Sequence, residues 1–399
     1  MKCAQTRIAS DLPEMLPIAG VYQVIVVGGG IAGCAAALAA ARSGVKVCLI
    51  EREFMVGGLA TLGLVWCYLP ICDGNGNQIS SGICEEFLKL SVKDCFNRIP
   101  MCWQTEGSFE ERKRNRYETE FNPLSFASNL EELLLSEGVA IRYGSQLCSV
   151  TKKDNRITSV VVSEKEGLKA ICCENIIDAS GDADVCYLVG DSVETRADNR
   201  LAYWLYSTDG ETVKRRELQT PLLKKLPDNE RRYSGIKTED ITDFCVEGRR
   251  RVNTFCKENG NQIPVMMATI PQIRMTRRLV GKYTLLLNDE GNWFDDSVGM
   301  IPDWRYRGSV FCVPYRMLLS NSINNLWVAG RCASAEADAG DTIRSIPACA
   351  VLGQAAGTAA AIASQCKIDA NAVPISFLQT MLEINGVIIN KRLLSKRIK

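Results

Sequence analysis

Residues Val21 to Gly33 read VYQVIVVGGGIAG, a β-branched run that ends in closely spaced glycines. Such a run is typical of a strand that is buried on both faces of a sheet. The Ala-rich segment Ile31 to Ser43 predicts a helix, and Val45 to Ile50 predicts a second strand. Together the three segments predict a βαβ unit and an α/β fold, with a Rossmann-like domain built on a central parallel sheet.

The glycines between the first strand and the helix have the spacing Gly-x-Gly-x-x-Gly at Gly28, Gly30 and Gly33. Gly28 allows a tight turn, Gly30 lets a pyrophosphate approach the backbone, and Gly33 lets the helix pack closely on the strand. Free N–H groups and the helix dipole at Ile31 and Ala32 favour an anion. Because strand, glycines and helix follow one another in the required order, the motif predicts a dinucleotide site.

Glu51 ends the second strand and is the expected partner of an adenosine ribose. Its negative charge disfavours NADP, whose additional phosphate it would repel. The glycine motif alone does not distinguish FAD from NAD. A second motif of this kind is absent from the sequence, so one bound dinucleotide is expected.

Further elements are predicted along the chain. Helices are expected over Ile83 to Lys93 and Leu124 to Glu137. Short β-like segments from Val139 to Cys173 predict a β-meander that precedes a strand at Asn175 to Ala179. A late buried strand is expected at Leu326 to Ala329.

The composition changes from Gly190 to about Gly308, where Arg, Lys, Asp and Asn become frequent. We therefore expect residues 1–190 and 308–399 to form a discontinuous dinucleotide-binding domain, and residues 191–307 a mixed α+β substrate or cap region. Pro347 to Ser364 is uncharged, but it is too short and too rich in Ala and Gly to favour lipid. We expect a buried helix there and no membrane span.

The composition excludes several classes of protein. The 399 residues carry 47 Lys and Arg against 46 Asp and Glu, so the net charge of +1 gives no field that would attract nucleic acid. Histidine is absent, which rules out Ser-His-Asp and Cys-His catalysis. The 18 cysteines include no Cys-x-x-Cys pair, so we expect no metal site and mostly reduced core thiols in a cytoplasmic protein.

Several segments after the glycine motif point to one family. They are, in order, Gly57-Gly58-Leu59-Ala60-Thr61, Gly82-Ile83-Cys84-Glu85-Glu86, Asp178-Ala179-Ser180-Gly181-Asp182, Arg274-Met275-Thr276-Arg277-Arg278, Val328-Ala329-Gly330-Arg331, Thr342-Ile343-Arg344 and Gly353-Gln354-Ala355-Ala356-Gly357. This series, from about Val21 to Ser364, resembles FAD-dependent oxidoreductases related to the glutathione-reductase and succinate-dehydrogenase flavoproteins.

The resemblance implies non-covalently bound FAD as the cofactor. The residues expected to contact it are Gly28, Gly30, Ile31, Ala32, Gly33, Glu51, Arg52, Gly57, Gly58, Leu59, Thr61, Leu147, Ser180, Gly181, Asp182, Gly330, Arg331, Ser345 and Ile346. In the related flavoproteins the last helix points at the N1–C2=O edge of the flavin, so its positive end here would stabilise negative charge on the reduced ring. Gly353 and Gly357 are expected to bring this helix close to the sheet.

Candidate catalytic residues are Arg344, Arg274 and Asp338. A flavin oxidation needs a base for the companion proton, which without histidine must be Asp, Glu, Tyr, Lys, Cys or water. Asp338 lies in the turn before the last helix and is a candidate base, with a loop or capping role as the alternative. Arg274 and Arg344 offer guanidinium forks for a carboxylate substrate or a negative flavin, or for structural acids. Cys67 is a candidate redox partner or thioether anchor, or else a packed thiol.

Two of these candidates lie beside departures from the family pattern. Ala337 stands where many relatives have His, and Met275 stands where the Arg-rich motif usually has Glu. These departures weaken the transfer of any catalytic role from the family, whereas FAD binding depends on the glycines and the backbone.

The function expected from these residues is hydride transfer between a small organic substrate and FAD. One alternative is a flavin subunit that passes electrons to a protein partner, and another is a protein that binds NAD without catalysis. No nucleic acid is expected as a partner, and a homo-oligomer remains open.

Overall fold

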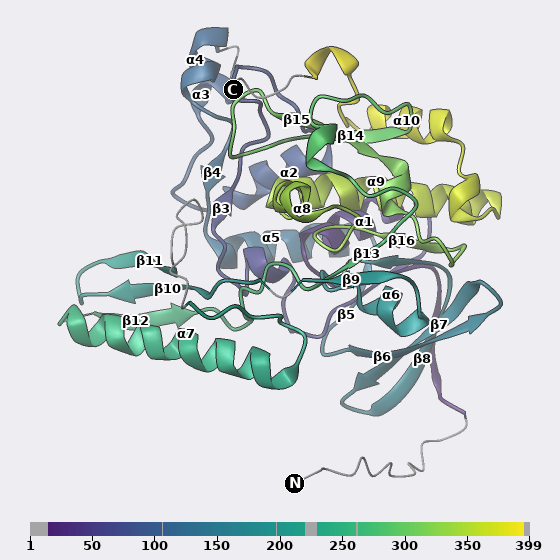
Figure 1. The fold of residues 1–399 in the computed structure, drawn as a ribbon, viewed down its shortest axis with the longest axis horizontal. Helices are drawn as coiled ribbons and strands as arrows, with labels where there is room; N and C mark the ends of the chain where they lie inside the picture. Colours follow the sequence, from purple (N-terminus) through teal and green to yellow (C-terminus); the bar gives the residue numbers. More distant parts are fainter. Residues whose placement is uncertain (1–14, 106, 197, 220–229, 261, 395–399) are drawn as a thin grey trace.

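The largest sheet combines a parallel part with an antiparallel meander (Figure 1). In spatial order its strands are β5 (Ala140–Arg142), β2 (Val47–Ile50), β1 (Ile18–Val27), β8 (Gly167–Asp178), β7 (Arg156–Glu164) and β6 (Gln146–Lys153), and β16 (Leu326–Val328) also pairs with β8. Strands β5, β2, β1, β8 and β16 are parallel, whereas β6, β7 and β8 form the meander. This confirms the predicted α/β fold. The computed structural model describes residues 15–105, 107–196, 198–219, 230–260 and 262–394.

One hydrophobic core joins this sheet to several helices, among them α1 (Ile31–Arg42), α2 (Ile83–Ser91), α5 (Pro123–Ser136) and α9 (Ile346–Cys366). The other described helices are α3 (Met101–Gln104), α4 (Phe109–Arg114), α6 (Asp184–Val189), α7 (Thr238–Glu258), α8 (Ala337–Ile343) and α10 (Ile375–Ile384). Short 3-10 turns occur at Gly58–Ala60, Leu287–Asp289, Tyr315–Leu318, Ala370–Ala372 and Lys391–Leu393, and β3 (Cys67–Tyr68) pairs with β4 (Thr119–Glu120).

The second half of β1 is buried on both faces, as its unbroken apolar run predicts. Val24 and Val26 belong to the core that contains α1 and α9. Ile25 and Val27 belong to a second core, on the side of the meander and α6. Successive side chains therefore enter opposite cores, which is why the segment shows no alternation with polar residues.

Helix α9 is buried over almost its whole length. Among the described helices it alone is long and apolar enough to cross a membrane, but 94% of its apolar window lies inside the protein. It packs directly on α1: a Cβ added at Gly353 would lie 2.2 Å from the carbonyl oxygen of Ala32, and one at Gly357 would lie 2.2 Å from that of Ala36. The close contact predicted for these glycines is thus made with α1 rather than with the sheet.

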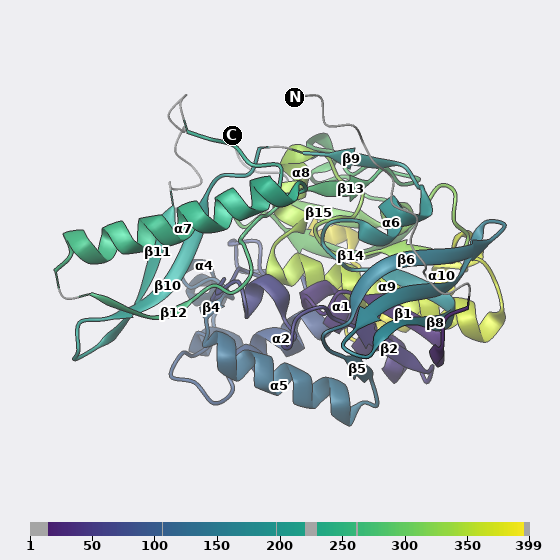
Figure 2. The same cartoon turned by 90° about the horizontal axis from the view of Figure 1, so that it is seen from below.

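A second region projects to one side of the large sheet (Figures 1 and 2). It consists of strands in the order β11 (Val213–Gln219), β10 (Ala202–Thr208) and β12 (Ile263–Met267), covered by α7. Tyr203 and Leu205 pack with Val252 of α7. Trp204 packs instead on Trp66 of the main body, with 4.6 Å between the ring centroids. Alternate residues of β10 therefore join this cap sheet to its helix on one face and to the main body on the other.

Two further antiparallel pairs lie outside the large sheet and the cap sheet. β9 (Val193–Thr195) pairs with β13 (Arg277–Leu279), and β14 (Ser297–Pro302) pairs with β15 (Val310–Pro314). Val298 and Ile301 of β14 belong to the same core as α9. The predicted limit between residues 307 and 308 thus falls in the loop between two paired strands, and the division into 1–190, 308–399 and 191–307 stays a prediction.

Two strands differ from the sequence prediction. Val139 to Tyr143, expected to open the meander, contains β5, which lies at the parallel edge beside β2. Asn175 to Ala179, expected as a separate strand, continues the long strand β8. Local alternation indicates a strand but specifies neither its partner nor its exact limits, which explains both differences.

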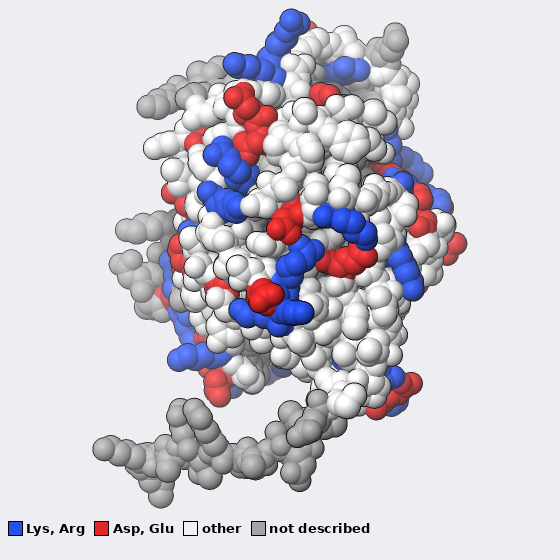
Figure 3. Space-filling view, turned by 90° about the vertical axis from the view of Figure 1, so that its right-hand side faces the viewer, with Lys and Arg blue, Asp and Glu red and all other residues white. Residues whose placement is uncertain are grey.

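Charged side chains of both signs lie interspersed on the face shown in Figure 3. Several charges of the described surface are paired. Arg42, for example, lies 2.7 Å from Glu86 and 2.8 Å from Glu137. This distribution agrees with the near-zero net charge of the sequence.

Candidate cofactor and substrate site

A cavity of about 320 Å³ lies where the carboxyl ends of β1, β2, β8 and β16 meet the starts of α1 and α9. Ligands of open α/β sheets bind at this edge, beyond the carboxyl ends of the strands. The cap completes the wall with Gly235, Ile241, Ile270, Pro271, Ile273, Arg274 and Thr276. The cavity is thus enclosed jointly by the main body and the cap.

The three glycines of the motif have different surroundings. Gly28 has a φ of +100°, and an added Cβ would lie 2.5 Å from the carbonyl oxygen of Ala179. A Cβ at Gly33 would lie 1.8 Å from the carbonyl oxygen of Gly28, so this residue fixes the contact between α1 and the turn. A Cβ at Gly30, which lines the cavity, would meet no atom within 4 Å. The space that a side chain would fill there is free for a ligand.

The start of α1 opens toward the cavity. Gly30 is the N-cap residue, no side chain hydrogen-bonds to the first turn, and that turn contains no acidic residue. Ile31 and Ala32 line the cavity. Because neither a side-chain cap nor an acidic residue of the first turn neutralises the positive end of the helix, this position suits a pyrophosphate.

Glu51 lies at the end of β2 and is buried in the cavity wall. Its carboxylate accepts hydrogen bonds from the backbone N–H groups of Gly29, at 2.6 Å, and Glu53, at 2.8 Å. Burial raises the pKa of this carboxyl group, and the two N–H donors oppose the shift. The side chain therefore ties β2 to the glycine turn at the position predicted for a ribose contact.

A second glycine pair, Gly57 and Gly58, approaches the first motif. The N–H of Gly57 donates to the carbonyl oxygen of Gly29 at 2.7 Å. The φ values of Gly57 and Gly58 are +98° and +54°, which favour glycine at both positions. Thr61 is buried behind them, and its hydroxyl donates to the carbonyl oxygen of Val56 at 2.6 Å. Thr61 thus supports this loop rather than lining the cavity.

Asp182 and Arg331 form an ion pair in the wall, with 3.1 Å between Oδ1 and Nη2. Burial opposes ionisation of Asp182, but Arg331 and the hydroxyl of Thr276, which donates at 2.7 Å, outweigh it and lower the pKa. Arg331 Nε is buried and has no hydrogen-bond partner among the described residues. An unpaired buried donor beside a cavity indicates a site for a polar ligand.

Helix α9 begins beside the cavity. Ser345 is its N-cap, and the Ser345 hydroxyl accepts a hydrogen bond from the N–H of Ala348 at 3.3 Å. Ile346 and Cys349 line the cavity, whereas Ser345 does not. Burial raises the pKa of the Cys349 thiol to about 11, so it is protonated at neutral pH.

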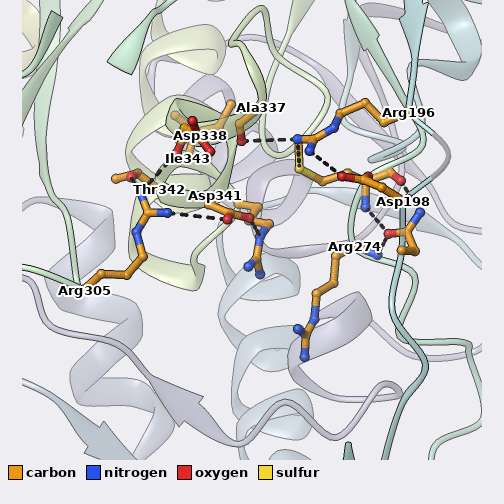
Figure 4. A network of polar contacts seen from close by, with 12 residues as sticks. Arg196, Asp198, Arg274, Arg305, Ala337, Asp338, Asp341, Thr342 and Ile343 are labelled. Carbon is orange, nitrogen blue, oxygen red and sulfur yellow. Dashed lines mark hydrogen bonds and ion pairs between the residues drawn. The ribbon is translucent and has the colours of Figure 1, made fainter. Parts of the chain in front are cut away.

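A network of arginines and acids surrounds α8, the helix that leads into α9 (Figure 4). Asp341 accepts a hydrogen bond from Arg344 Nε at 2.8 Å and lies 3.4 Å from Arg305. Burial opposes ionisation of Asp341, but these two arginines outweigh it and lower the pKa. Arg196 donates to the carbonyl oxygen of Ala337 at 3.2 Å. Charged side chains therefore hold both ends of α8.

Arg274 reaches the cavity from the cap, and its side chain extends away from this network (Figure 4). Its Nη2 donates to Gln219 at 2.8 Å, and no carboxylate of the described chain lies within 4.0 Å. Burial and the positive charge of Arg344 lower the pKa of Arg274 to about 10. Arg344 lines the cavity as well. Two guanidinium groups, one from each region, therefore face the same space.

Residues 23–204 and 202–382 match the model of a family described as FAD dependent oxidoreductase. The chain belongs to this family. Its cofactor is FAD, and the site fits this dinucleotide in three respects. These are the free space at Gly30, the uncapped start of α1 and the unpaired donor of Arg331.

Curated relatives of this FAD-dependent oxidoreductase match over short segments. The thioredoxin reductase of Ureaplasma parvum serovar 3 is 38% identical over 72 residues, which are 18% of this chain and 23% of that enzyme. A 4-oxocyclohex-2-ene-1-carboxylate 5-dehydrogenase of Sinomonas cyclohexanicum is 35% identical over 80 residues, which are 18% of this chain and 13% of the relative. The matches therefore span less than a quarter of either relative.

Solved structures resemble the chain over most of its length. A geranylgeranyl bacteriochlorophyll reductase-like protein of Thermoplasma acidophilum has 15% identity and a TM-score of 0.45, and the match covers 92% of this chain and 83% of that one. For the p-nitrophenol 4-monooxygenase of Pseudomonas putida the identity is 13% and the TM-score is 0.47, with coverage of 92% and 88%.

The cavity of this oxidoreductase brings together most of the residues predicted from the sequence. These are Gly28, Gly30, Ile31, Ala32, Glu51, Arg52, Gly57, Gly58, Leu59, Leu147, Ser180, Gly181, Asp182, Arg274, Gly330, Arg331, Arg344 and Ile346. Gly33, Thr61 and Ser345 do not line it, since they pack against the backbone that forms it. Individual contacts with bound FAD stay predictions.

Asp338, the candidate base, is not brought to the cavity. It is exposed in the first turn of α8, and its carbonyl oxygen accepts a hydrogen bond from Arg305 at 3.1 Å. Cys67 does not line the cavity either, because it packs with Trp66 and Trp204. Burial raises the pKa of the Cys67 thiol to about 12.

The sequence prediction missed part of the wall. The residues concerned include Glu53, Ser145, Gln146, Ala179, Asp184, Gly235, Ile241, Ile270, Pro271, Ile273, Thr276, Ala329 and Cys349. Some of them carried a signal. Ala179, Thr276 and Ala329 lie inside the family segments quoted above. Asp184 lies two residues after Asp182, and Cys349 lies in the first turn of the predicted last helix. Within the described residues, no group of three or more Cys, Asp and Glu side chains is arranged to hold a metal ion.

Proposed function

We propose that this flavoprotein transfers a hydride between a small organic substrate and non-covalently bound FAD. The proposal is supported by the composition of the cavity wall, in which the glycine-rich segments meet the cap residues Ile241, Ile273 and Arg274. These cap residues belong to no nucleotide motif. A protein that only relays electrons to a partner does not need a second wall of this kind, whereas a substrate pocket does.

Bound FAD supplies the acceptance or donation of a hydride. The chain would bind it mainly through backbone groups. In this proposal the start of α1 binds the pyrophosphate, Glu51 accepts hydrogen bonds from the ribose, and the positive end of α9 stabilises negative charge. Asp182 holds Arg331, whose free Nε donates to the ligand.

The companion proton has few acceptors on this chain. The carboxylates that line the cavity are Glu51, Glu53, Asp182 and Asp184, all from segments that follow β2 and β8. The cap and the start of α9 contribute Arg274, Arg344 and the protonated thiol of Cys349. Asp338 is exposed and outside the wall. We therefore assign the proton to water that enters the cavity rather than to a side-chain base.

The nucleophiles at hand support the proposal of non-covalent binding. The sequence contains no histidine. Among the described cysteines only Cys349 lines the cavity, and its raised pKa keeps it a thiol, which is a poor nucleophile. Denaturation is therefore expected to release the flavin completely into the supernatant.

The test is anaerobic reduction of the purified, FAD-loaded protein by a panel of small organic compounds. We expect at least one compound to bleach the visible flavin band in a single turnover. Deuterium at the reacting C–H bond of that compound should slow the bleaching. Reduction by dithionite and by a reduced electron-transfer protein, but by none of the compounds, would contradict hydride transfer and favour the relay of electrons to a protein partner.

A further inference from the structure

We infer that the substrate carries a carboxylate next to an apolar body, and that Arg274 of the cap and Arg344 of the main body bind this carboxylate together. The inference rests on the proposed function and names the chemical class of its substrate. It depends on three observations: the charge at the cavity, the free donor groups of both guanidinium groups and the apolar residues beside Arg274.

Positive charge at this part of the cavity is not balanced by the protein. Arg274 has only the neutral Gln219 as a side-chain hydrogen-bond partner within the described chain. Arg344 has Asp341, but Asp341 is shared with Arg305 and does not line the cavity. The acids whose charges act on Arg274, Asp341 and Glu217, both lie more than 4.0 Å from it, so neither pairs with it directly.

Four other arginines near the cavity do not share this condition. Each is paired with its own acid, Arg277 with Asp184, Arg278 with Glu194, Arg305 with Asp303 and Arg331 with Asp182. A partly buried guanidinium group is normally paired in this way, because desolvation of the charge is otherwise costly. The missing partner of Arg274 is therefore best supplied by a ligand.

The geometry of the donors suits a carboxylate. Arg344 Nε donates a hydrogen bond to Asp341. The described residues offer no hydrogen-bond partner to the two terminal nitrogens of Arg344. Arg274 likewise retains donors beyond the single bond to Gln219. A planar fork from each side can bind both oxygens of one carboxylate, and charge-assisted bonds of this kind are stronger than neutral ones.

The surroundings of Arg274 select the rest of the substrate. Pro271 and Ile273 precede it in the chain and line the cavity together with Ile241 and Ile270. These four side chains offer no hydrogen bonds to a polar ligand. An apolar group attached to the carboxylate would bury its surface against them, whereas a second charged group would lose its hydration without compensation.

The experiment uses the oxidised, FAD-loaded protein and three probes: hexanoate, acetate and the uncharged hexanamide. Binding is measured by calorimetry and by the change in the visible flavin spectrum. Hexanoate is expected to bind at least 10-fold more tightly than hexanamide, because only hexanoate neutralises the two arginines. It is also expected to bind more tightly than acetate, because only hexanoate has an apolar body.

Arg274→Met is expected to weaken hexanoate binding at least 10-fold and to leave the FAD content and hexanamide binding unchanged. Arg274→Lys keeps the charge but not the fork and should lie between Arg274→Met and the natural protein. Arg316→Met is the matched control, because Arg316 is exposed, is paired with Asp296 and does not line the cavity. This control should bind all three probes as the natural protein does.

Two results would overturn the inference. The first is equal affinity for hexanoate and hexanamide in the natural protein, which decides the question even if Arg274→Met does not fold. The second is an Arg274→Met variant that binds hexanoate normally but has a shifted flavin reduction potential, because the arginines would then serve the cofactor. If only uncharged compounds reduced the flavin, this inference would be wrong and hydride transfer would stand. If the protein selected hexanoate but no compound reduced its flavin, this inference would stand and hydride transfer would be wrong.

Discussion

Gly30 is a residue where a new side chain should affect the ligand but not the fold. Its φ of −69° and ψ of 179° suit any amino acid, and no atom lies within 4 Å of an added Cβ. Gly30→Leu is therefore expected to keep the unfolding free energy of the FAD-free protein within about 0.5 kcal/mol. FAD binding should weaken by about 100-fold, or ~2.7 kcal/mol, since the side chain fills the space beside α1. Flavin titration and urea unfolding measure the two quantities.

Gly33→Ala is the matched control, with the opposite expectation. Its Cβ would lie 1.8 Å from the carbonyl oxygen of Gly28, so α1 must move away from the turn. The unfolding free energy should fall by about 3 kcal/mol. If Gly30→Leu weakened FAD binding but also lost about as much stability as Gly33→Ala, the specific role of Gly30 would be refuted.

Asp184 should make the stability of the FAD-free protein depend on pH. Burial and the charges of Asp182 and Asp178 raise its pKa from 3.8 to about 6, and Arg277, at 2.5 Å, opposes the shift. The folded protein therefore keeps this proton to a higher pH than the unfolded chain does. The stabilisation that results is complete below about pH 3.8 and is lost as the pH rises through about 6.

Asp184→Asn removes this titration. Relative to the natural protein, the unfolding free energy of the variant should increase by about 2 kcal/mol between about pH 4 and pH 7, because only the natural protein loses stability over that interval. Urea unfolding of both FAD-free proteins at the two pH values gives the difference. A difference that does not change with pH would show that Asp184 titrates in the folded protein as it does in the unfolded chain.

The pairing of α1 with α9 depends on small residues along both helices. Replacing glycine by alanine inside a helix usually stabilises it by up to about 1 kcal/mol. At Gly357 the sign should reverse, because the new Cβ would lie 2.2 Å from the carbonyl oxygen of Ala36 and would push the helices apart. We expect Gly357→Ala to lower the unfolding free energy by about 3 kcal/mol in urea unfolding. A variant more stable than the natural protein would contradict the contact.

How well an element is predicted depends on the range of the contacts that define it. β1, α1 and β2 end within three residues of their predicted limits, because their apolar runs and glycines are local signals. β5 was recognised as a strand without its partner, since its pairing with β2 links residues far apart in the sequence. Gly353 and Gly357 indicated a close contact but not that α1 would be the contacting element.

The same reasoning separates the two walls of the site. The dinucleotide wall is predictable because consecutive backbone groups from Gly28 to Gly33, followed by one acid at Glu51, form much of it. The cap wall is not, because Gly235, Ile241 and Ile273 share no motif and come together only through the packing of the cap. Arg274 was found there only through its resemblance to an Arg-rich family segment.

Cap and main body meet at a cluster of aromatic rings beside the cofactor loop. Trp66 lies between Trp204 and Tyr206, with centroid distances of 4.6 and 5.2 Å. Gln272 also donates to the carbonyl oxygen of Gly63 at 2.5 Å. The loop that begins at the second glycine pair therefore anchors the segment that carries Arg274. Substrate wall and cofactor wall are thus mechanically connected, although they are built from different regions.

Trp204→Ala tests whether this junction positions the substrate wall. Removing the ring should lower the unfolding free energy by about 3 to 4 kcal/mol. Hexanoate binding should weaken about 10-fold, because Arg274 loses its fixed distance from Arg344, a loss of ~1.4 kcal/mol. FAD affinity should change much less, because the glycine turn and α1 do not contact the aromatic cluster.

Trp204→Phe is the control: Trp204 Nε1 has no hydrogen-bond partner among the described residues, so this variant keeps most of the packing and loses no hydrogen bond. Equal losses of FAD and hexanoate affinity in Trp204→Ala would mean that the two walls form a single unit, and the separate roles assigned to them would then be wrong.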